Sequence, residues 1–481
     1  MLAGVLVFLY FRWPFTPERF ERSLAQGTHS RVAIRQSSMF FFPSPGLILK
    51  DVEFRRGGQQ AAPIATVRQI RAVGSWISLL TLQHRLSALE TEGLVVDLPD
   101  QIPPPENNGT GKPLKTTVAS VLLDGAVLKN SGLRFQFDRL RLRDAGPNEQ
   151  IGFDAVLQNP SPRGRIAAQG SIGPWKDDMG SIRASGSFEL TGADLAQYKD
   201  LAGVVQAKGK VTGALSGLKV DGTAAVSGFE VNHNGHAIDL RAAYSAVVNG
   251  LNGDTTLDSV NGHFLQTDLS AHGAVKASKG HDGKTVELDF YSRNARIQDL
   301  LLLATKAQPP ALSGPITLRA HVAVPPEDMP FLKKVELRGD FRIPRARFNK
   351  AQTQEKVDEL SARAEDGVQQ DRVFSQLSGA VDLKHGIAQL HDCRFAVPGA
   401  VATGGGTYNV LTKVVNLDGT VEMKATVSEA STGLKSILLK PFNAAFRNRK
   451  QNAGAELPVH VVGQYPHPQF HVNLVGKKRR R

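Results

Sequence analysis

The chain has 481 residues, of which 41% are hydrophobic and 21% charged, so it is too apolar for an intrinsically disordered protein. Its single cysteine, Cys393, excludes an internal disulfide and any metal cluster built on cysteines. The net charge of +13 indicates an anionic partner, and nucleic acid, phospholipid headgroups and lipopolysaccharide all fit that charge.

The chain begins with an apolar run, MLAGVLVFLYF, which is followed by Arg12, Trp13 and Pro14. The run is shorter than the roughly 20 residues of a spanning helix. It also lacks the basic region and the cleavage site of a signal peptide. Tyr10 and Trp13 suit a membrane interface, although the basic residues after the run argue against export of that side. We expect residues 1–14 to be a membrane anchor that lacks its first part. The alternative is a buried N-terminal strand or helix.

Residues 15–100 are expected to form an N-terminal region of strands and short helices. The segment TPERFERSLAQ predicts an amphipathic helix with a threonine cap, and two strands should flank the Pro-Ser-Pro-Gly of 43–46. A strand, a short helix at Trp76–Leu82 and a strand at Leu94–Leu98 follow. Residues 101–115, rich in Pro, Asn and Gly, indicate a linker or an exposed loop.

The segment GLRFQFDRLRLRD, at 132–144, shows the pattern that recurs in the following region. Apolar and polar side chains alternate, as they do on a strand with one wet and one apolar face. The apolar residues of the first part are Leu133, Phe135 and Phe137, and those of the second are Leu140 and Leu142. Because the second pair has the opposite parity, we expect a β-bulge or a tight turn near Asp138–Arg139.

Residues 116–373 repeat a loose unit of strand, turn and strand without a fixed period, interrupted by a helix predicted at 294–307. Strands resume over 374–475, with a helical stretch at 431–450. The closing basic tail, 476–481, is either a solvated end or a phosphate-binding segment. About 20–25 candidate strands and few helices predict a mainly β protein. The strands fit a closed sandwich or barrel as well as an open trough.

Motifs of known enzyme classes are missing. The sequence has no nucleophile elbow, P-loop, zinc-protease helix or paired-cysteine motif. The nearest group of histidines, His460, His467 and His471, fits solvent-facing strand positions better than a metal site. The Gly-rich TGGGT at 403–407 predicts a close approach of two strands rather than a phosphate-binding loop. We therefore expect a protein that is not an enzyme and that needs no cofactor or metal.

Four segments together resemble the AsmA-like family of bacterial envelope proteins. They are PGLILKDVEFRR (45–56), the strand–helix–strand stretch 67–99, the strand-rich stretch 374–423, and 433–470, which carries a Leu-Pro-aliphatic, Gly and Pro-x-Phe pattern. The resemblance covers both ends of the chain well and the middle only in its strand texture. Its motifs describe strands rather than an active site.

The resemblance implies an elongated, repetitive antiparallel β-sheet curled into an open apolar groove, with an N-terminal membrane helix and a few short helices. It implies a single-pass inner-membrane protein with its bulk in the periplasm, which supports outer-membrane biogenesis by binding or transferring phospholipid. The expected partners are phospholipid or another envelope lipid, the membrane and outer-membrane assembly proteins, but no nucleic acid. The alternative is a non-enzymatic scaffold that regulates assembly of outer-membrane proteins.

Two sets of residues are the candidates for this function. The candidate groove residues are Leu133, Phe135, Phe137, Leu288 and Phe290. The second set, in the predicted C-terminal helix, is Leu434, Ile437, Leu438 and Phe442. That helix would cap the groove or touch a membrane surface. Alternatively, it would close the end of the sheet as part of the core.

Overall fold

The fold is mainly β, with 69% of the described residues in strands and 12% in helices. The computed structural model describes residues 16–28, 30–56, 62–80, 85–98, 117–130, 133–146, 149–176, 178–198, 200–231, 235–278, 283–364, 373–423, 455–464 and 469–472. No helix in these ranges is long and apolar enough to cross a membrane. The anchor expected at 1–14, the linker at 101–115 and the tail at 476–481 lie outside them.

The chain divides into two compact units. Unit 1 consists of 1–194, 205–223 and 247–253, and unit 2 consists of 195–204, 224–246 and 254–481. Three strands contribute residues to both units: β12 (Leu201–Ala214), β13 (Gly217–Val231) and β14 (Ile238–Val248).

Unit 1 begins with a helix and three antiparallel strands. Its elements up to β11 are α2 (Pro17–Thr28), β1 (Arg31–Phe40), β2 (Gly46–Arg55), β3 (Pro63–Val73), α3 (Trp76–Leu80), β4 (Arg85–Leu86), β5 (Ala88–Glu92), β6 (Val95–Leu98), β7 (Thr117–Asn130), β8 (Leu133–Ala145), β9 (Ile151–Pro160), β10 (Arg163–Ile172), the 3₁₀ turn η1 (Met179–Ser181) and β11 (Arg183–Asp194). The predicted first helix and the two strands around 43–46 are confirmed.

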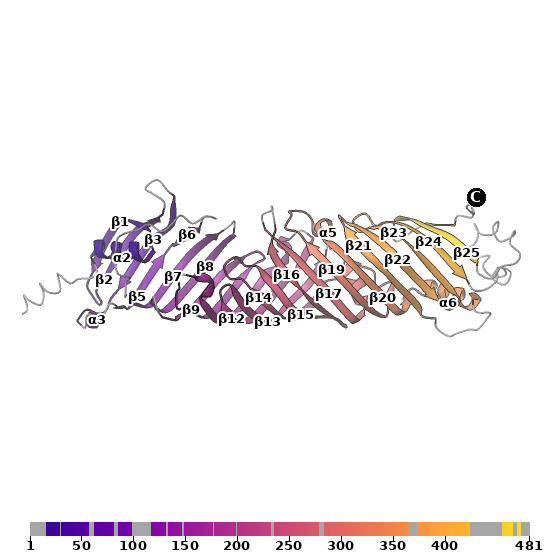
Figure 1. The fold of residues 1–481 in the computed structure, drawn as a ribbon, viewed down its shortest axis with the longest axis horizontal. Coiled ribbons are helices and arrows are strands. Elements are labelled where there is room, and N and C mark those ends of the chain that lie inside the picture. Colours follow the sequence, from indigo (N-terminus) through magenta and orange to yellow (C-terminus); the bar gives the residue numbers. More distant parts are fainter. Residues whose placement is uncertain are drawn as a thin grey trace, which may run out of the picture. The chain divides into compact units, whose positions relative to one another are not determined.

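A buried cluster joins α2 to the first three strands. In Figure 1 the helix lies against these strands at the indigo end of the chain, and Phe20 is its buried contribution. Leu47 and Leu49 of β2 and Ile70 of β3 lie in the same cluster. Asp51 has φ 51°, in the left-handed region, and it changes the parity of β2 so that Val52 also faces this core. One apolar face therefore continues along the whole strand.

The expectation of a purely antiparallel sheet is wrong at one place. The described strands form a mixed sheet rather than a purely antiparallel one. The short strands β4, β5 and β6 all pair in parallel with β7, and β5 and β6 also pair antiparallel with β3. β6 ends at Leu98 and β7 begins at Thr117, and the two strands run in the same direction. A parallel pair needs a connection of a dozen or more residues.

Unit 2 continues as antiparallel neighbours with short helices between some of them. Its elements are the 3₁₀ turn η2 (Leu195–Gln197), β15 (Thr255–Phe264), β16 (Thr267–Ala277), β17 (Lys284–Arg296), α4 (Ile297–Ala304), β18 (Leu312–Ser313), β19 (Pro315–Val324), α5 (Phe331–Lys334), β20 (Glu336–Phe348), α6 (Ala351–Ala364), β21 (Ser375–Lys384), β22 (Ile387–Val397), β23 (Ala400–Asn409), β24 (Val414–Met423), β25 (Ala455–Gln464) and β26 (Gln469–Val472).

Unit 2 has two local cores, one beside α4 and one beside α6. Ala295, Ile316, Ile343 and Ala346 are buried beside α4, and Val357 of α6 is buried against the β22–β23 turn. The helix predicted at 294–307 is confirmed but shorter, because 294–296 still belong to β17. Within β23 the predicted close approach of strands is confirmed. Gly406 has φ 146°, and a Cβ there would collide with the backbone carbonyl of Asn416.

A buried carboxylate fastens α4 to the β15–β16 hairpin. Asp299 is 4% exposed, and it accepts hydrogen bonds from the Gln266 amide at 2.9 Å and the Thr267 hydroxyl at 2.8 Å. The Thr267 hydroxyl in turn accepts from the Arg296 amide at 2.9 Å. Asp299 lies in the first turn of α4, where the positive end of the helix dipole favours its negative charge.

Replacing this carboxylate should destabilise unit 2. We expect Asp299→Ala to lower the free energy of unfolding by about 1–3 kcal/mol, because the buried Thr267 hydroxyl and the part-buried Gln266 amide lose their acceptor. The matched control is Asp268→Ala in the same hairpin, where the exposed carboxylate should contribute under about 1 kcal/mol. Urea denaturation of both variants measures the difference, and equal losses would contradict a special role of Asp299.

Candidate functional site

The β8 strand keeps its apolar side chains on one face by means of a bulge. In the pairing of β8 with β9 the register shifts by one residue between Phe137 and Arg139. Asp138 and Arg139 are both exposed, whereas Phe135, Phe137, Leu140 and Leu142 are half-buried. The bulge predicted near Asp138–Arg139 is therefore confirmed, and it restores the face that the change of parity would otherwise lose.

The pairing of neighbouring strands aligns further apolar residues with those of β8, so the apolar face continues from β7 to β11. Residues directly opposite each other in a ladder point to the same side of the sheet. One row consists of Ala126, Phe137, Leu157, Ile166 and Leu190, from β7 to β11. The next consists of Leu123, Leu140, Ala155, Ala168 and Phe188. We call the surface formed by these two rows the unit 1 apolar face.

The opposite face of the same strands is polar and exposed. Arg143 of β8 forms an ion pair with Asp154 of β9 at 3.1 Å, and Gln158 donates to the Asp138 carboxylate at 2.8 Å. The two faces of this part of the sheet thus differ sharply in character.

Unit 2 has an apolar face of the same kind, and it contains Leu288 and Phe290. The row of Phe290 consists of Ala271, Phe290, Ala320, Gly339, Val381, Leu390, Gly406 and Leu417, from β16 to β24. The row of Leu288 consists of Gly273, Leu288, Val322, Leu337, Leu383 and Ala388. Residues separated by most of the unit in sequence therefore line one surface.

Between β7 and β16 the apolar side of the sheet is only partly covered in the described part of the chain. The strands β7 to β16 place no described residue in any of the three buried clusters. Some apolar side chains of these strands are buried, among them Ile151, Ile238 and Phe264, whereas Phe137, Leu157 and Ile166 are half-buried. The apolar surface that remains is available to a ligand.

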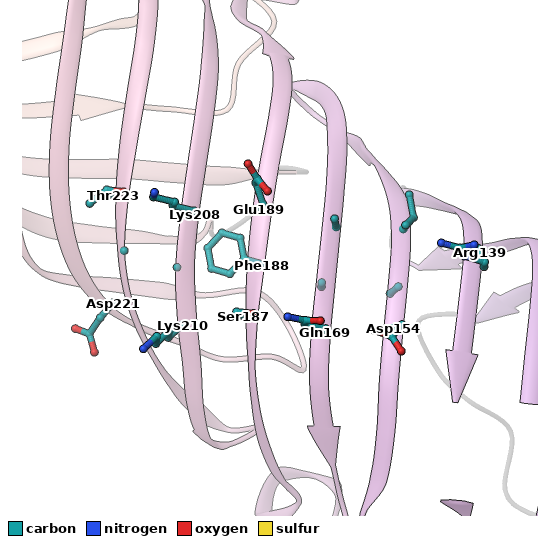
Figure 2. A pocket seen from close by; sticks show the side chains of 16 residues that line it. Arg139, Asp154, Gln169, Ser187, Phe188, Glu189, Lys208, Lys210, Asp221 and Thr223 are labelled. Carbon is teal, nitrogen blue, oxygen red and sulfur yellow. The ribbon is translucent and has the colours of Figure 1, made fainter. Parts of the chain in front are cut away.

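Two hollows are bordered mainly by polar side chains, and each lining also includes residues of the apolar rows. The hollow in unit 1, about 620 Å³, runs from β8 to β13, and Figure 2 shows charged side chains from neighbouring strands around it. Its cations are Arg139, Lys208 and Lys210, and its anions are Asp154, Glu189 and Asp221. The lining carries as many acidic as basic side chains, so it shows no preference for an anion or a cation.

The hollow in unit 2, about 900 Å³, is bordered by a ladder of polar side chains that sequence reasoning missed. His321 bonds Asp289 at 2.8 Å, and Arg338 bonds Asp382 at 2.8 Å, each across neighbouring strands. Phe290, a candidate groove residue, contributes to the floor. Such pairs depend on strand register. The spacing of His321 and Asp289 in the sequence does not indicate that the two side chains meet. Exposed pairs of this kind contribute little stability.

Not every candidate residue falls within the described part of the chain. The backbone of Leu133 pairs with Asn130, but its side chain is outside the described set. The four candidates of the predicted C-terminal helix lie in 424–454, which is also outside it, and so does His467. His460, on β25, bonds Asp418 across the strands at 2.7 Å. In the described ranges no three His, Cys, Asp or Glu side chains are placed to hold a metal ion.

Cys393 is a half-buried thiol on β22. Burial raises the pKa of this thiol, and the neighbouring Asp392 carboxylate raises it further. Since the thiolate is the reactive form, less of it exists at pH 8 than for a free thiol. We expect iodoacetamide to alkylate Cys393 at least about fivefold more slowly than glutathione at that pH. Mass spectrometry of the native protein measures the rate. Urea-unfolded protein, which should react like glutathione, is the control. Equal native and unfolded rates would contradict the expectation.

Comparisons of the chain with family models, curated proteins and solved structures found no match.

Proposed function

We propose that the apolar faces of the two units hold the acyl chains of phospholipid, and that the protein binds or transfers this lipid in support of outer-membrane biogenesis. The single observation that carries the proposal is the unit 1 apolar face. Its rows of Phe, Leu and Ile are half-buried and belong to no buried cluster. Each acyl methylene placed on such a face would gain about 0.8 kcal/mol.

The geometry explains how binding would work without a specific polar contact. Small residues such as Ala155 and Ala168 lie in the row beside Leu157 and Ile166, so the surface is uneven and a flexible chain can settle between larger side chains. Dispersion and burial of apolar area are non-directional, and they would accept acyl chains of different lengths. The proposal assigns no catalytic residue and no cofactor.

The remaining parts of the proposal rest on the resemblance to AsmA-like envelope proteins. That resemblance supports an inner-membrane anchor at the N-terminus, a periplasmic position for the strands and a role in the cell envelope. The positive charge of the chain suits an anionic phospholipid surface. The anchor, the periplasmic position and the envelope role belong to the same proposal as phospholipid binding.

Photo-crosslinking along β8 tests the proposal directly. Benzoylphenylalanine is placed singly at positions 135 to 142 of the full chain, in cells labelled with radioactive phosphate. Phospholipid should be captured at Phe135, Phe137 and Leu140. The positions at Gln136, Asp138 and others on the polar face should capture none. The alternation should therefore skip one step at the bulge, a pattern that unspecific contact with lipid cannot produce.

The rival role is a scaffold for assembly of outer-membrane proteins. Capture of protein instead of phospholipid at Phe137 and Leu140 would contradict lipid binding and favour the scaffold. Capture of neither, in a folded protein, would show that the face is closed in the cell and would overturn the proposal.

A further inference from the structure

Large apolar side chains project from one end of unit 1. We call this group the loop-end patch: Met39, Phe41 and Phe42 at the β1–β2 turn, with Trp76 and Ile77 of α3. Phe42 is 91% exposed, Ile77 73% and Phe41 53%. Such side chains normally enter a core, as Leu47 and Leu49 do a few residues further along.

The two parts of the patch are held together by hydrogen bonds. The Trp76 indole donates to the Pro43 carbonyl at 3.2 Å, and the Gly74 amide donates to the Pro45 carbonyl at 2.8 Å. Phe40 pairs with Gly46, which pairs with Val73, so the end of β1, the start of β2 and the end of β3 meet there. The patch is therefore a fixed feature of this end and not a loose loop.

The helix α2 points from the other end of these strands toward the patch. Arg56, just after β2, donates to the Thr28 carbonyl at 2.5 Å and to the Ser30 hydroxyl at 3.2 Å. These bonds hold the C-terminal end of α2 at the end of the strands opposite to the β1–β2 turn. Because Phe20 packs into the core beneath, α2 runs back along the strands and its first residue, Pro17, is directed toward the patch end.

This direction decides which partner the patch fits. The first described residue, Thr16, directly precedes α2, and the sequence before it begins with the apolar run 1–11. Arg19, in the first turn of α2, is exposed and suits an anionic headgroup. Exposed Phe and Trp side chains at turns are typical of the interfacial zone of a bilayer.

We propose that the loop-end patch docks into a lipid bilayer, with Phe42 and Ile77 inserted at the boundary between headgroups and acyl chains. The docking holds unit 1 with this end against the membrane surface. One point of attachment to the membrane would leave unit 1 free to tilt. The inserted side chains of Phe42 and Ile77 add further points of contact and fix the orientation of unit 1. The inference concerns a surface of the protein that the proposed acyl-chain binding does not use.

Fluorescent labelling at single positions tests the docking. In full-length protein that carries Cys393→Ser, the substitutions Phe42→Cys and Ile77→Cys are labelled with a nitrobenzoxadiazole dye. The proteins are then reconstituted into vesicles of phosphatidylethanolamine and phosphatidylglycerol. The matched control is Met179→Cys, which is 54% exposed in the same unit but lies outside the patch.

Dyes at 42 and 77 should shift their emission to the blue and be quenched by lipids with a nitroxide at the headgroup end of the acyl chain. Quenching by a nitroxide near the bilayer centre should be weaker, because an interfacial residue reaches only about 5–10 Å into the boundary region. The dye at 179 should remain in water. Water-like emission at 42 and 77 would overturn the inference.

Two further outcomes separate docking from its rivals. A blue shift that needs no vesicles and grows with protein concentration would show that the patch pairs two copies of the chain, and would overturn docking. Docking without phospholipid crosslinks on β8 would keep this inference while contradicting the proposed function. Crosslinks without docking would do the reverse.

Discussion

Phe137→Asp should lower the amount of phospholipid bound to the purified protein at least about tenfold, because a carboxylate in the row would have to be desolvated by any acyl chain that covers it. Phe137 lies between Ala126 and Leu157 in the register of the unit 1 apolar face. The loss also includes the favourable burial of the phenyl ring, about 1.5–3 kcal/mol for a fully covered side chain.

The neighbouring position provides the control. Gln136→Asp introduces the same carboxylate one residue away, on the exposed polar face of β8. It should leave bound lipid within about twofold of the wild type, because a carboxylate in water carries no desolvation cost. Lipid is extracted from protein purified in mild detergent and quantified by mass spectrometry, and circular dichroism confirms that both variants keep their strands. Equal lipid in the two variants would exclude this face as the binding surface.

Leu49→Ala should lower the local free energy of unfolding of β1 to β3 by about 2–5 kcal/mol. Leu49 is 0% exposed and packs in the cluster that joins α2 to these strands. Removal of its branched end leaves a cavity that strands bound on both sides cannot fill. The loss should also detach α2, because Phe20 depends on the same cluster.

Native-state hydrogen exchange of peptides from β1 to β3 measures this effect separately from the rest of the chain. The control is Lys50→Ala, the next residue, whose exposed side chain should change stability by no more than about 0.5 kcal/mol. Peptides from β21 to β24 in unit 2 should keep their exchange rates in both variants. A uniform acceleration over the whole chain would show that the clusters do not unfold independently.

The sequence predicted those features that depend on neighbours along the chain. Alternation of apolar residues and one change of parity were sufficient to predict the bulge at Asp138, and a threonine followed by proline was sufficient for α2. The helix α6 was missed, although 351–364 is rich in good helix formers and Val357 could have marked its buried side. The helix contains few apolar residues, so the 3.6-residue periodicity that predicts a helix is weak there.

Features that depend on register were beyond the sequence. The parallel pairing of β5 with β7 follows from the path of the chain between them, which local propensity does not encode. The partner of His321 is Asp289, and only the alignment of β17 with β19 reveals the pair. The rows of the apolar faces also become visible only when the strands are aligned. Candidate residues such as Leu288 and Phe290 could be proposed one by one, but not the surface that they share with β19 to β24.

The order of pairing has a consequence for how the protein is made. From β7 to β11, and again through most of unit 2, each strand pairs with the strand that precedes it in the chain. Contacts between near neighbours close short loops, and such closures are fast and cost little entropy. When the strands fold in chain order, each new strand meets a partner that has already formed. The growing edge then exposes one strand at a time, and the next strand covers it.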